Sequence, residues 1–219
     1  MDNPVAAGAI ILAGGASSRM GETKSIVEIN GKTMLQLVIE SLTKSGFKSV
    51  ILSLKNKEQW EEITNSMIIK KKPPDFFQID NTTLPFQVCF DSSIPNKPNS
   101  PIIGLISSIE KALDNGWKTV QVTPCDVPYL SPELPQLLFS KLSGQFDCVV
   151  AHSNSGIEPL LFCSKTKTLN EVLGTEVYSA RQVITNLNSY EVKPDEWSIN
   201  GITNQCFTNV NTLEDIEIQ

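Results

Sequence analysis

A glycine-rich segment with two cations lies near the start of the chain. The apolar run 8–13 ends at Gly14 and Gly15, and Arg19 and Lys24 follow it. Glycines expose backbone amides and allow a ligand to approach closely, while Arg and Lys can meet triphosphate oxygens. The spacing is neither that of a P-loop nor that of GxGxxG, so those mechanisms do not transfer. The segment indicates anion binding, and the alternative is an ordinary glycine-rich turn with two solvated cations.

A carboxylate stands at the end of a second apolar segment. Asp126 follows the β-rich run 119–123 and is held between Pro124 and Pro128. Mg²⁺ commonly takes one or two protein carboxylates and completes its shell with phosphate oxygens. Asp126 is therefore a candidate metal ligand, although Asp-x-Pro sequences also occur in simple turns.

A third polar position follows the apolar run 86–90. Asp91 comes directly after it and precedes Ser92 and Ser93. An acidic side chain at a strand end can bind a ligand, and an Asp before serines also caps turns and helices. Both interpretations of Asp91 stay open at this point.

The string LAGGASSRMGETK at residues 12–24 resembles the signature LAGGxSxRMGxxK of the sugar-nucleotide and cofactor nucleotidyltransferases, in particular the MobA-like molybdenum-cofactor guanylyltransferases. Further motifs of this family recur in the same order along nearly the whole chain: DSS at 91–93, SPIIG at 100–104, PCDVP at 124–128, EPL at 158–160 and NVNT at 209–212. One departure is Ser100, which stands where the family usually has a glycine.

The resemblance implies a role for each motif. Catalysis would rest on Arg19, Lys24 and Asp126, with Asp126 holding Mg²⁺ and Lys24 contacting the phosphates. The remaining nucleotide and acceptor contacts would come from Leu12, Ala13, Gly14, Gly15, Asp91, Pro101, Gly104, Asn209 and Asn211. After the second strand, where relatives present an asparagine, the candidates are Ser53 and Asn56; Ser53 is our prediction.

By the same resemblance, the reaction is transfer of GMP from GTP to molybdopterin with release of pyrophosphate, which yields a guanine dinucleotide cofactor. Gly14 favours guanine, because the cytidylate-transferring branch usually has LAAG in place of LAGG. The alternatives are a cytidylyltransferase or another nucleotidyltransferase with a different phosphorylated acceptor, or a nucleotide-binding regulator without turnover. Expected partners are GTP and molybdopterin, and further a molybdoenzyme or a cofactor-delivery protein.

The elements that must position these residues alternate between strands and helices. Apolar runs predict strands at 8–13, 49–54, 86–90, 119–123, 147–152 and 159–162. Helical spacing and caps predict helices at 33–47, 57–67, 105–113, 131–142, 168–173 and 179–187. Residues 70–85 are expected to be an irregular insertion, and NVNT a strand leading into a short capped helix.

This alternation predicts a single α/β domain over residues 1–219, with a mainly parallel sheet covered by helices on both faces. The resemblance makes it Rossmann-like, of the nucleotide-diphospho-sugar transferase type. In such sheets ligands bind beyond the carboxyl ends of the strands, which is where the glycines, Asp91 and Asp126 are expected to lie.

Composition narrows the function classes. The net charge of −6 disfavours general binding to nucleic acid, since phosphate backbones attract basic surfaces. Five widely spaced cysteines without a CxxC pair argue against a disulfide framework and a zinc site. We expect no signal peptide and no membrane segment, because the apolar run near the N-terminus is short and lacks a basic region. A cytoplasmic location is the resulting prediction.

Overall fold

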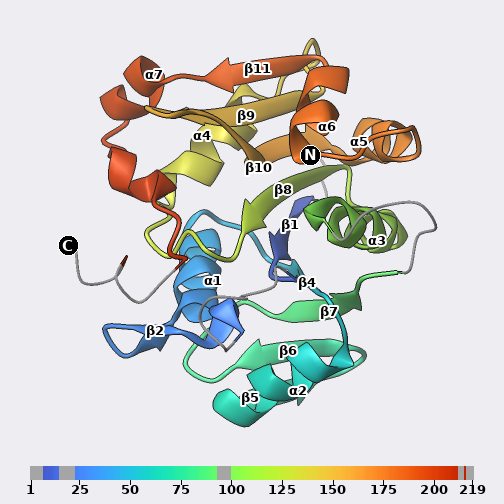
Figure 1. Cartoon of the computed structure of the whole chain (residues 1–219), viewed down its shortest axis with the longest axis vertical. Helices are drawn as coiled ribbons and strands as arrows, with labels where there is room; N and C mark the ends of the chain where they lie inside the picture. Colours follow the sequence, from blue (N-terminus) through green and yellow to red (C-terminus); the bar gives the residue numbers. More distant parts are fainter. Residues whose placement is uncertain (1–6, 15–22, 93–99, 212–214, 216–219) are drawn as a thin grey trace, which may run out of the picture.

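The computed structural model describes residues 7–14, 23–92, 100–211 and 215. Within these residues, nine strands form one sheet in the order β11-β9-β10-β8-β1-β4-β7-β6-β5, which runs from top to bottom of Figure 1. Its middle is made of four parallel strands, β8 (Thr119–Pro124), β1 (Ala7–Leu12), β4 (Val50–Leu54) and β7 (Phe86–Phe90). The predicted α/β fold with helices on both faces of a mostly parallel central sheet is confirmed.

The central strands are apolar on both sides because both faces of the sheet are covered. In β1, Ile10 and Leu12 face one core, and Ala9 and Ile11 face the other. All five residues of β4 are buried. The apolar residues that predicted these strands are therefore consecutive because helices cover both faces of the sheet.

The first core packs against α3 (Pro101–Asp114), α5 (Thr166–Leu173) and α6 (Ala180–Asn186). The second packs against α1 (Met34–Lys44), α2 (Lys57–Ser66), α4 (Glu133–Lys141) and α7 (Pro194–Ile199). Shorter elements are the β2–β3 hairpin (Glu28–Ile29 and Lys32–Thr33) and two 3₁₀ turns, η1 (Lys24–Ile26) and η2 (Asn204–Phe207). No helix among the described residues combines the length and the apolar character needed to cross a membrane.

The edge beyond β8 mixes strand directions. There β10 (Gly156–Lys165) runs antiparallel to both β8 and β9 (Cys148–Ser153), and β11 (Ser189–Val192) pairs parallel with β9. The strands predicted at 147–152 and 159–162 correspond to β9 and β10. β11 and α7 lie in the part of the chain that the sequence pattern left unassigned.

The prediction of an irregular insertion at 70–85 is wrong. This segment holds an antiparallel hairpin of β5 (Ile69–Lys72) and β6 (Phe76–Ile79) that extends the sheet beyond β7. Phe77 packs against Phe86 of β7 and Trp60 of α2, with ring centroids 6.0 and 4.9 Å away. Aromatic packing thus anchors a strand pair in a segment for which the sequence pattern predicted no regular structure.

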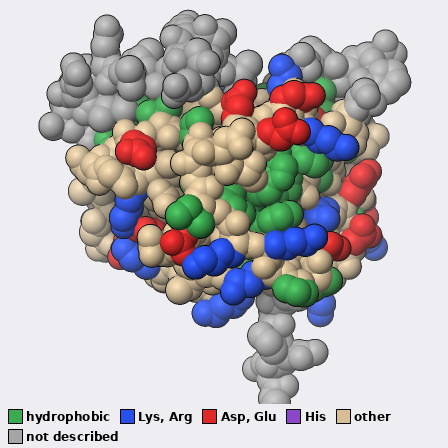
Figure 2. Space-filling view, turned by 90° about the horizontal axis from the view of Figure 1, so that it is seen from below, with side chains coloured by type: hydrophobic (Ala, Val, Ile, Leu, Met, Phe, Trp, Pro, Cys, Tyr) green, Lys and Arg blue, Asp and Glu red, His purple; other side chains and the backbone are tan. Residues whose placement is uncertain are grey.

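Lysines 70–72 lie exposed on the outermost strand, a position where charge discourages pairing with another chain. Seen from below, this end of the molecule shows a band of Lys side chains beside a hydrophobic strip, with acidic side chains beyond the strip and at the ends of the band (Figure 2). The surface there carries both signs of charge.

The register of the parallel strands aligns their carboxyl ends. Leu12 of β1 is level with Ser53 of β4 and Pro124 of β8, and Ser53 is level with Cys89 of β7. From β1 the chain proceeds to β4, continues to the edge strands β5 and β6, comes back beside β4 as β7, and then crosses to the opposite side of β1 as β8. Such a reversal opens a crevice at the strand ends, the usual ligand position in an α/β sheet.

Candidate active site

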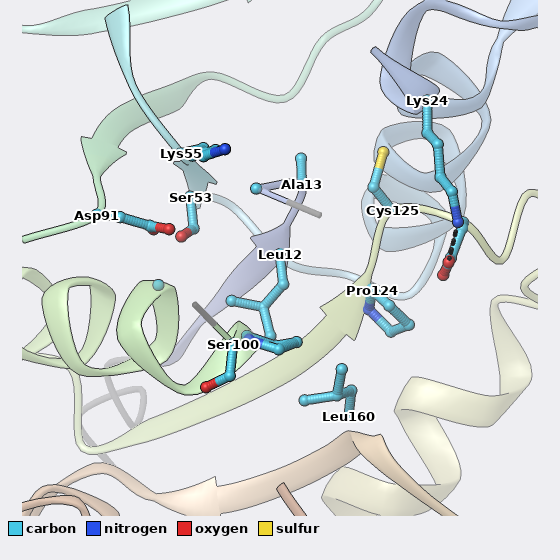
Figure 3. A pocket seen from close by; sticks show the side chains of 14 residues that line it. Leu12, Ala13, Lys24, Ser53, Lys55, Asp91, Ser100, Pro124, Cys125 and Leu160 are labelled. Carbon is cyan, nitrogen blue, oxygen red and sulfur yellow. Dashed lines mark hydrogen bonds and ion pairs between the residues drawn. The ribbon is translucent and has the colours of Figure 1, made fainter. Parts of the chain in front are cut away.

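A cavity of about 290 Å³ lies at this reversal point, over the carboxyl ends of β1, β4, β7 and β8. Figure 3 shows it from close by, with the end of β1 between an Asp91 side and a Lys24 side. Its lining comprises Leu12, Ala13, Gly14, Lys24, Ser53, Lys55, Asp91, Ser100, Pro101, Gly104, Pro124, Cys125, Asp126 and Leu160. All the motifs singled out in the sequence except NVNT therefore contribute to one cavity.

Backbone hydrogen bonds fix the floor of the cavity. Ala13 N donates to Ser53 O over 2.9 Å, and Cys125 N donates to Leu12 O over 3.0 Å. Leu12, Ala13 and Gly14, which were predicted to contact a nucleotide, line the cavity. Gly15 and Arg19, also predicted to contact a nucleotide, lie outside the described residues.

One end of the cavity joins a cation to a carboxylate. Lys24 Nζ lies 3.2 Å from Asp126 Oδ2 and also donates to Asn211 Oδ1. The two charged side chains are 19% and 26% exposed, so a ligand can still reach them. Val210 N donates to Asp126 O over 2.9 Å and thereby ties the C-terminal segment to this corner.

Oxygen donors at this corner suit a hard cation such as Mg²⁺. Asp126 supplies a carboxylate and Asn211 an amide carbonyl, and the remaining ligands of such an ion usually come from phosphates and water. No cluster of three or more His, Cys, Asp or Glu exists among the described residues that would enclose a metal by protein alone. Neighbouring Cys125 is buried, which raises the pKa of its thiol and keeps it protonated.

The opposite end holds Asp91. Its Oδ1 atom is buried and has no hydrogen-bond partner among the described residues. Burial raises the pKa of Asp91 to about 6, and the charge of Lys55 partly opposes this rise. A carboxylate oxygen without a partner beside a cavity is ready to accept a hydrogen bond from a ligand.

The raised pKa of Asp91 should make the free energy of unfolding depend on pH. The folded-state pKa of about 6 lies above the ordinary 3.8, so the folded state loses stability as the pH rises through the interval between these values. Asp91→Asn removes the effect and should raise the free energy of unfolding at pH 7 by about 1 kcal/mol, a value reduced for solvent screening.

Urea denaturation of both proteins from pH 4.5 to 8 measures the difference. The difference in the free energy of unfolding between the two proteins should become smaller toward pH 4.5. A difference that is constant with pH would contradict the raised pKa.

The lack of a side chain at Gly104 leaves space for the side chains of Asp91 and Ser53. A Cβ atom at position 104 would lie 2.5 Å from Ser53 Oγ and 2.9 Å from Asp91 Oδ1. Gly104→Ala must therefore displace two cavity side chains, at a cost of about 1–3 kcal/mol in folding stability. We expect nucleotide affinity to fall by about tenfold as well, since roughly 1.4 kcal/mol lost from the contacts has that effect.

Gly144→Ala is the matched control for this prediction, because a Cβ there meets no atom within 4 Å. Urea denaturation and nucleotide titration of both variants provide the measurement. Equal behaviour of the two variants would refute the role of Gly104.

The loop at the start of α3 tolerates its unusual serine. Ser100 has φ −148°, an extended conformation open to any residue, and Pro101 occupies the first turn of the helix. The helix predicted at 105–113 begins earlier, at Pro101, so Gly104 belongs to the helix itself. Ser100, Pro101 and Gly104 all line the cavity.

Of the two candidates after the second strand, Ser53 lines the cavity, whereas Asn56 caps α2 by accepting from Gln59 N over 3.0 Å. Lys55 was missed. Strand alternation contained the signal, because residues two apart project to the same face and Ser53 was already a candidate.

A second cavity of about 220 Å³ adjoins the first and shares Pro124, Asp126 and Leu160 with it. Asn209, Asn211 and Glu158 also line it. The predicted strand at NVNT is wrong, since residues 209–211 form no regular structure. Asn209 and Asn211 line this cavity together with Asp126, in a segment fixed by the backbone bond of Val210 to that residue, and their contact with an acceptor stays a prediction.

Comparison with known proteins places the whole arrangement in context. Residues 9–190 match the family model described as the MobA-like NTP transferase domain. A protein of Bacillus anthracis named probable molybdenum cofactor guanylyltransferase is 27% identical over 94% of this chain and 92% of its own length. A protein of the same name from Bacillus cereus is 26% identical over the same shares.

Solved structures share the fold. The molybdopterin-guanine dinucleotide biosynthesis protein A of Archaeoglobus fulgidus superposes with a TM-score of 0.68 at 17% identity, covering 96% of this chain and 95% of the other. The 4-diphosphocytidyl-2C-methyl-D-erythritol synthase of Anaerococcus prevotii does so with a TM-score of 0.63 at 13% identity, covering 96% and 94%. At these identities the likeness concerns the fold alone.

Proposed function

Since the chain belongs to the MobA-like NTP transferase family, we propose that this nucleotidyltransferase transfers GMP from GTP to molybdopterin and releases pyrophosphate. The observation that carries the proposal is the meeting of two cavities at Asp126, beside Lys24. One cavity can hold a nucleotide and the other an acceptor, so that the reacting phosphates meet at the shared wall. The relatives named for guanylyl transfer support this choice of substrates.

The charged side chains at the two ends of the cavity favour one orientation of the nucleotide. The triphosphate belongs near Lys24, whose ammonium can neutralise it, and Arg19 is proposed to add a second cation. The base then extends past Gly14 toward Asp91 and Ser53. A carboxylate there repels phosphate but accepts hydrogen bonds from base N–H groups.

The reaction we propose is in-line attack of the acceptor phosphate on the α-phosphorus of GTP. An ionised phosphate nucleophile needs no strong general base, so catalysis can rest on positioning and charge neutralisation. Lys24 would hold the phosphates, and Asn209 and Asn211 would orient the acceptor in the second cavity. The protonated Cys125 takes no part as a nucleophile.

Asp126 and Asn211 would hold Mg²⁺. The ion would supply Lewis-acid neutralisation of the phosphate charge. Nucleotide binding would draw Lys24 from Asp126 toward the phosphates and free the carboxylate for this task.

Guanine is favoured at the base end by the geometry around Gly14. A Cβ at this position would lie 3.2 Å from Lys55 N and 3.4 Å from Asp91 Oδ2. An alanine would therefore narrow the place where the base edge meets Asp91. The fold by itself does not choose the base, because a cytidylyl-named enzyme shares it, so a cytidylyltransferase is the alternative.

A pyrophosphate-release assay with Mg²⁺ and molybdopterin, comparing GTP, CTP, ATP and UTP, tests the proposal. We expect release with GTP alone. Release with CTP alone would establish the alternative. GTP binding without release from any nucleotide would indicate another acceptor or a regulator without turnover.

A further inference from the structure

Lys55 occupies the base end of the nucleotide cavity, where no role has been assigned to it. It follows directly after Leu54, the last residue of β4, and lines the cavity together with Ser53 and Asp91. Figure 3 shows its side chain on the same side of the cavity as Asp91 and Ser53, remote from Lys24. The cationic side chain of Lys55 is therefore available at the base end, far from the corner where Lys24 is proposed to bind the phosphates.

The backbone of Lys55 is held firmly. Lys55 N donates to Gln59 Oε1 over 2.8 Å, and Gln59 Nε2 donates to Ala13 O over 2.7 Å. Gln59 is only 8% exposed, and Asn56 fixes the first turn of α2 on which it stands. The side chain of Gln59 thus links the end of β4 to the end of β1. The backbone of Lys55 is therefore held in a fixed position beside the cavity.

The ammonium group of Lys55 is available to a ligand. Lys55 is exposed, and its Nζ makes no hydrogen bond or ion pair with any described side chain. It nevertheless lies near enough to Asp91 to influence that carboxylate. One donor and one acceptor thus line the same end of the cavity (Figure 3), each with unused hydrogen-bonding capacity.

This pair matches the edge of guanine. The edge presents the O6 acceptor next to N1–H and the exocyclic amino group, which are donors. Asp91 can accept from the donors while Lys55 donates to O6. Adenine has an amino donor where guanine has O6, and that amino group would face the ammonium.

We propose that Lys55 is a specificity-determining residue that donates a hydrogen bond to the C6 carbonyl oxygen of guanine. The proposal rests on the proposed use of GTP. It predicts that the preference for an oxygen at C6 resides in this side chain, whereas a lysine that touched only phosphates would not sense the base.

The test is equilibrium binding of GTP and 6-thioguanosine triphosphate, which replaces O6 by a poorer acceptor and keeps N1–H and the amino group. The unaltered protein should bind GTP about tenfold more tightly, the effect of one charge-assisted hydrogen bond. Lys55→Met should lose about tenfold in GTP affinity and show nearly equal affinities for the two nucleotides. Lys55→Arg, which keeps a charged donor, should restore part of the preference.

Lys57→Met is the matched control, since Lys57 is an exposed lysine two residues away that does not line the cavity. It should keep the preference of the unaltered protein. Equal weakening of both nucleotides by Lys55→Met would place the lysine on the phosphates and overturn the inference while GTP use stands. Failure of the unaltered protein to bind GTP at all would overturn the proposed function and this inference together.

Discussion

Asp126→Asn is expected to lower kcat with GTP by at least about a hundredfold while leaving the fold intact. The substitution keeps the size of the side chain but removes the charge that would hold Mg²⁺ at the meeting point of the two cavities. Loss of a preorganised charge-stabilising group in a reaction centre typically costs about 10²–10³ in rate. Asp126 is 26% exposed, and its main structural contact to Val210 uses the backbone carbonyl, which the variant keeps.

The measurement is steady-state pyrophosphate release at several Mg²⁺ concentrations, with urea denaturation as the check on folding. Asp75→Asn, at an exposed turn between β5 and β6, is the control for the loss of one carboxylate. Activity of Asp126→Asn near that of the control would remove Asp126 from the mechanism.

The second large effect concerns the phosphates. Lys24→Met should weaken GTP binding by about 10- to 100-fold, because charge-assisted hydrogen bonds contribute about 1.5–3 kcal/mol each. The stem of the side chain is kept, so packing should change little. The loss should be larger for GTP than for GMP, since GTP presents three phosphates to the cation and GMP only one.

Isothermal titration of GTP and GMP measures this prediction. Lys167→Met, an exposed lysine on α5 away from both cavities, is the matched control. Unchanged GTP affinity in Lys24→Met would mean that the triphosphate lies elsewhere. An equal loss for GTP and GMP would indicate that Lys24 acts on the α-phosphate alone.

Local pattern was sufficient for the parts of the fold that position the site. The apolar runs at 8–13, 49–54, 86–90 and 119–123 each became a central parallel strand, because a strand covered on both faces must be apolar throughout. Asp91 and Asp126 stand at strand ends, and the register of parallel strands brings such positions to one edge. Their position at one edge of the sheet was therefore predictable, whereas the ion pair of Lys24 with Asp126 follows from tertiary structure.

Long-range pairing explains the errors. The β5–β6 hairpin depends on aromatic contacts with β7 and α2, which no local window reveals. β11 is a short strand that pairs in parallel with β9, about forty residues earlier in the chain. Lys55 was overlooked although strand alternation places it on the same face as Ser53, because only the cavity shows what that face meets. A single domain over residues 1–219 and a cytoplasmic location stay predictions.

Nucleotidyl transfer carries the α-phosphate of GTP to the acceptor, and labelled phosphorus tests this most directly. The protein would be incubated with Mg²⁺, molybdopterin and GTP labelled on either the α- or the γ-phosphate, and the products separated. We predict that the α-label joins the acceptor and that the γ-label appears in pyrophosphate. Transfer of the γ-label to the acceptor, or release of the γ-label as free phosphate, would contradict nucleotidyl transfer in this cavity.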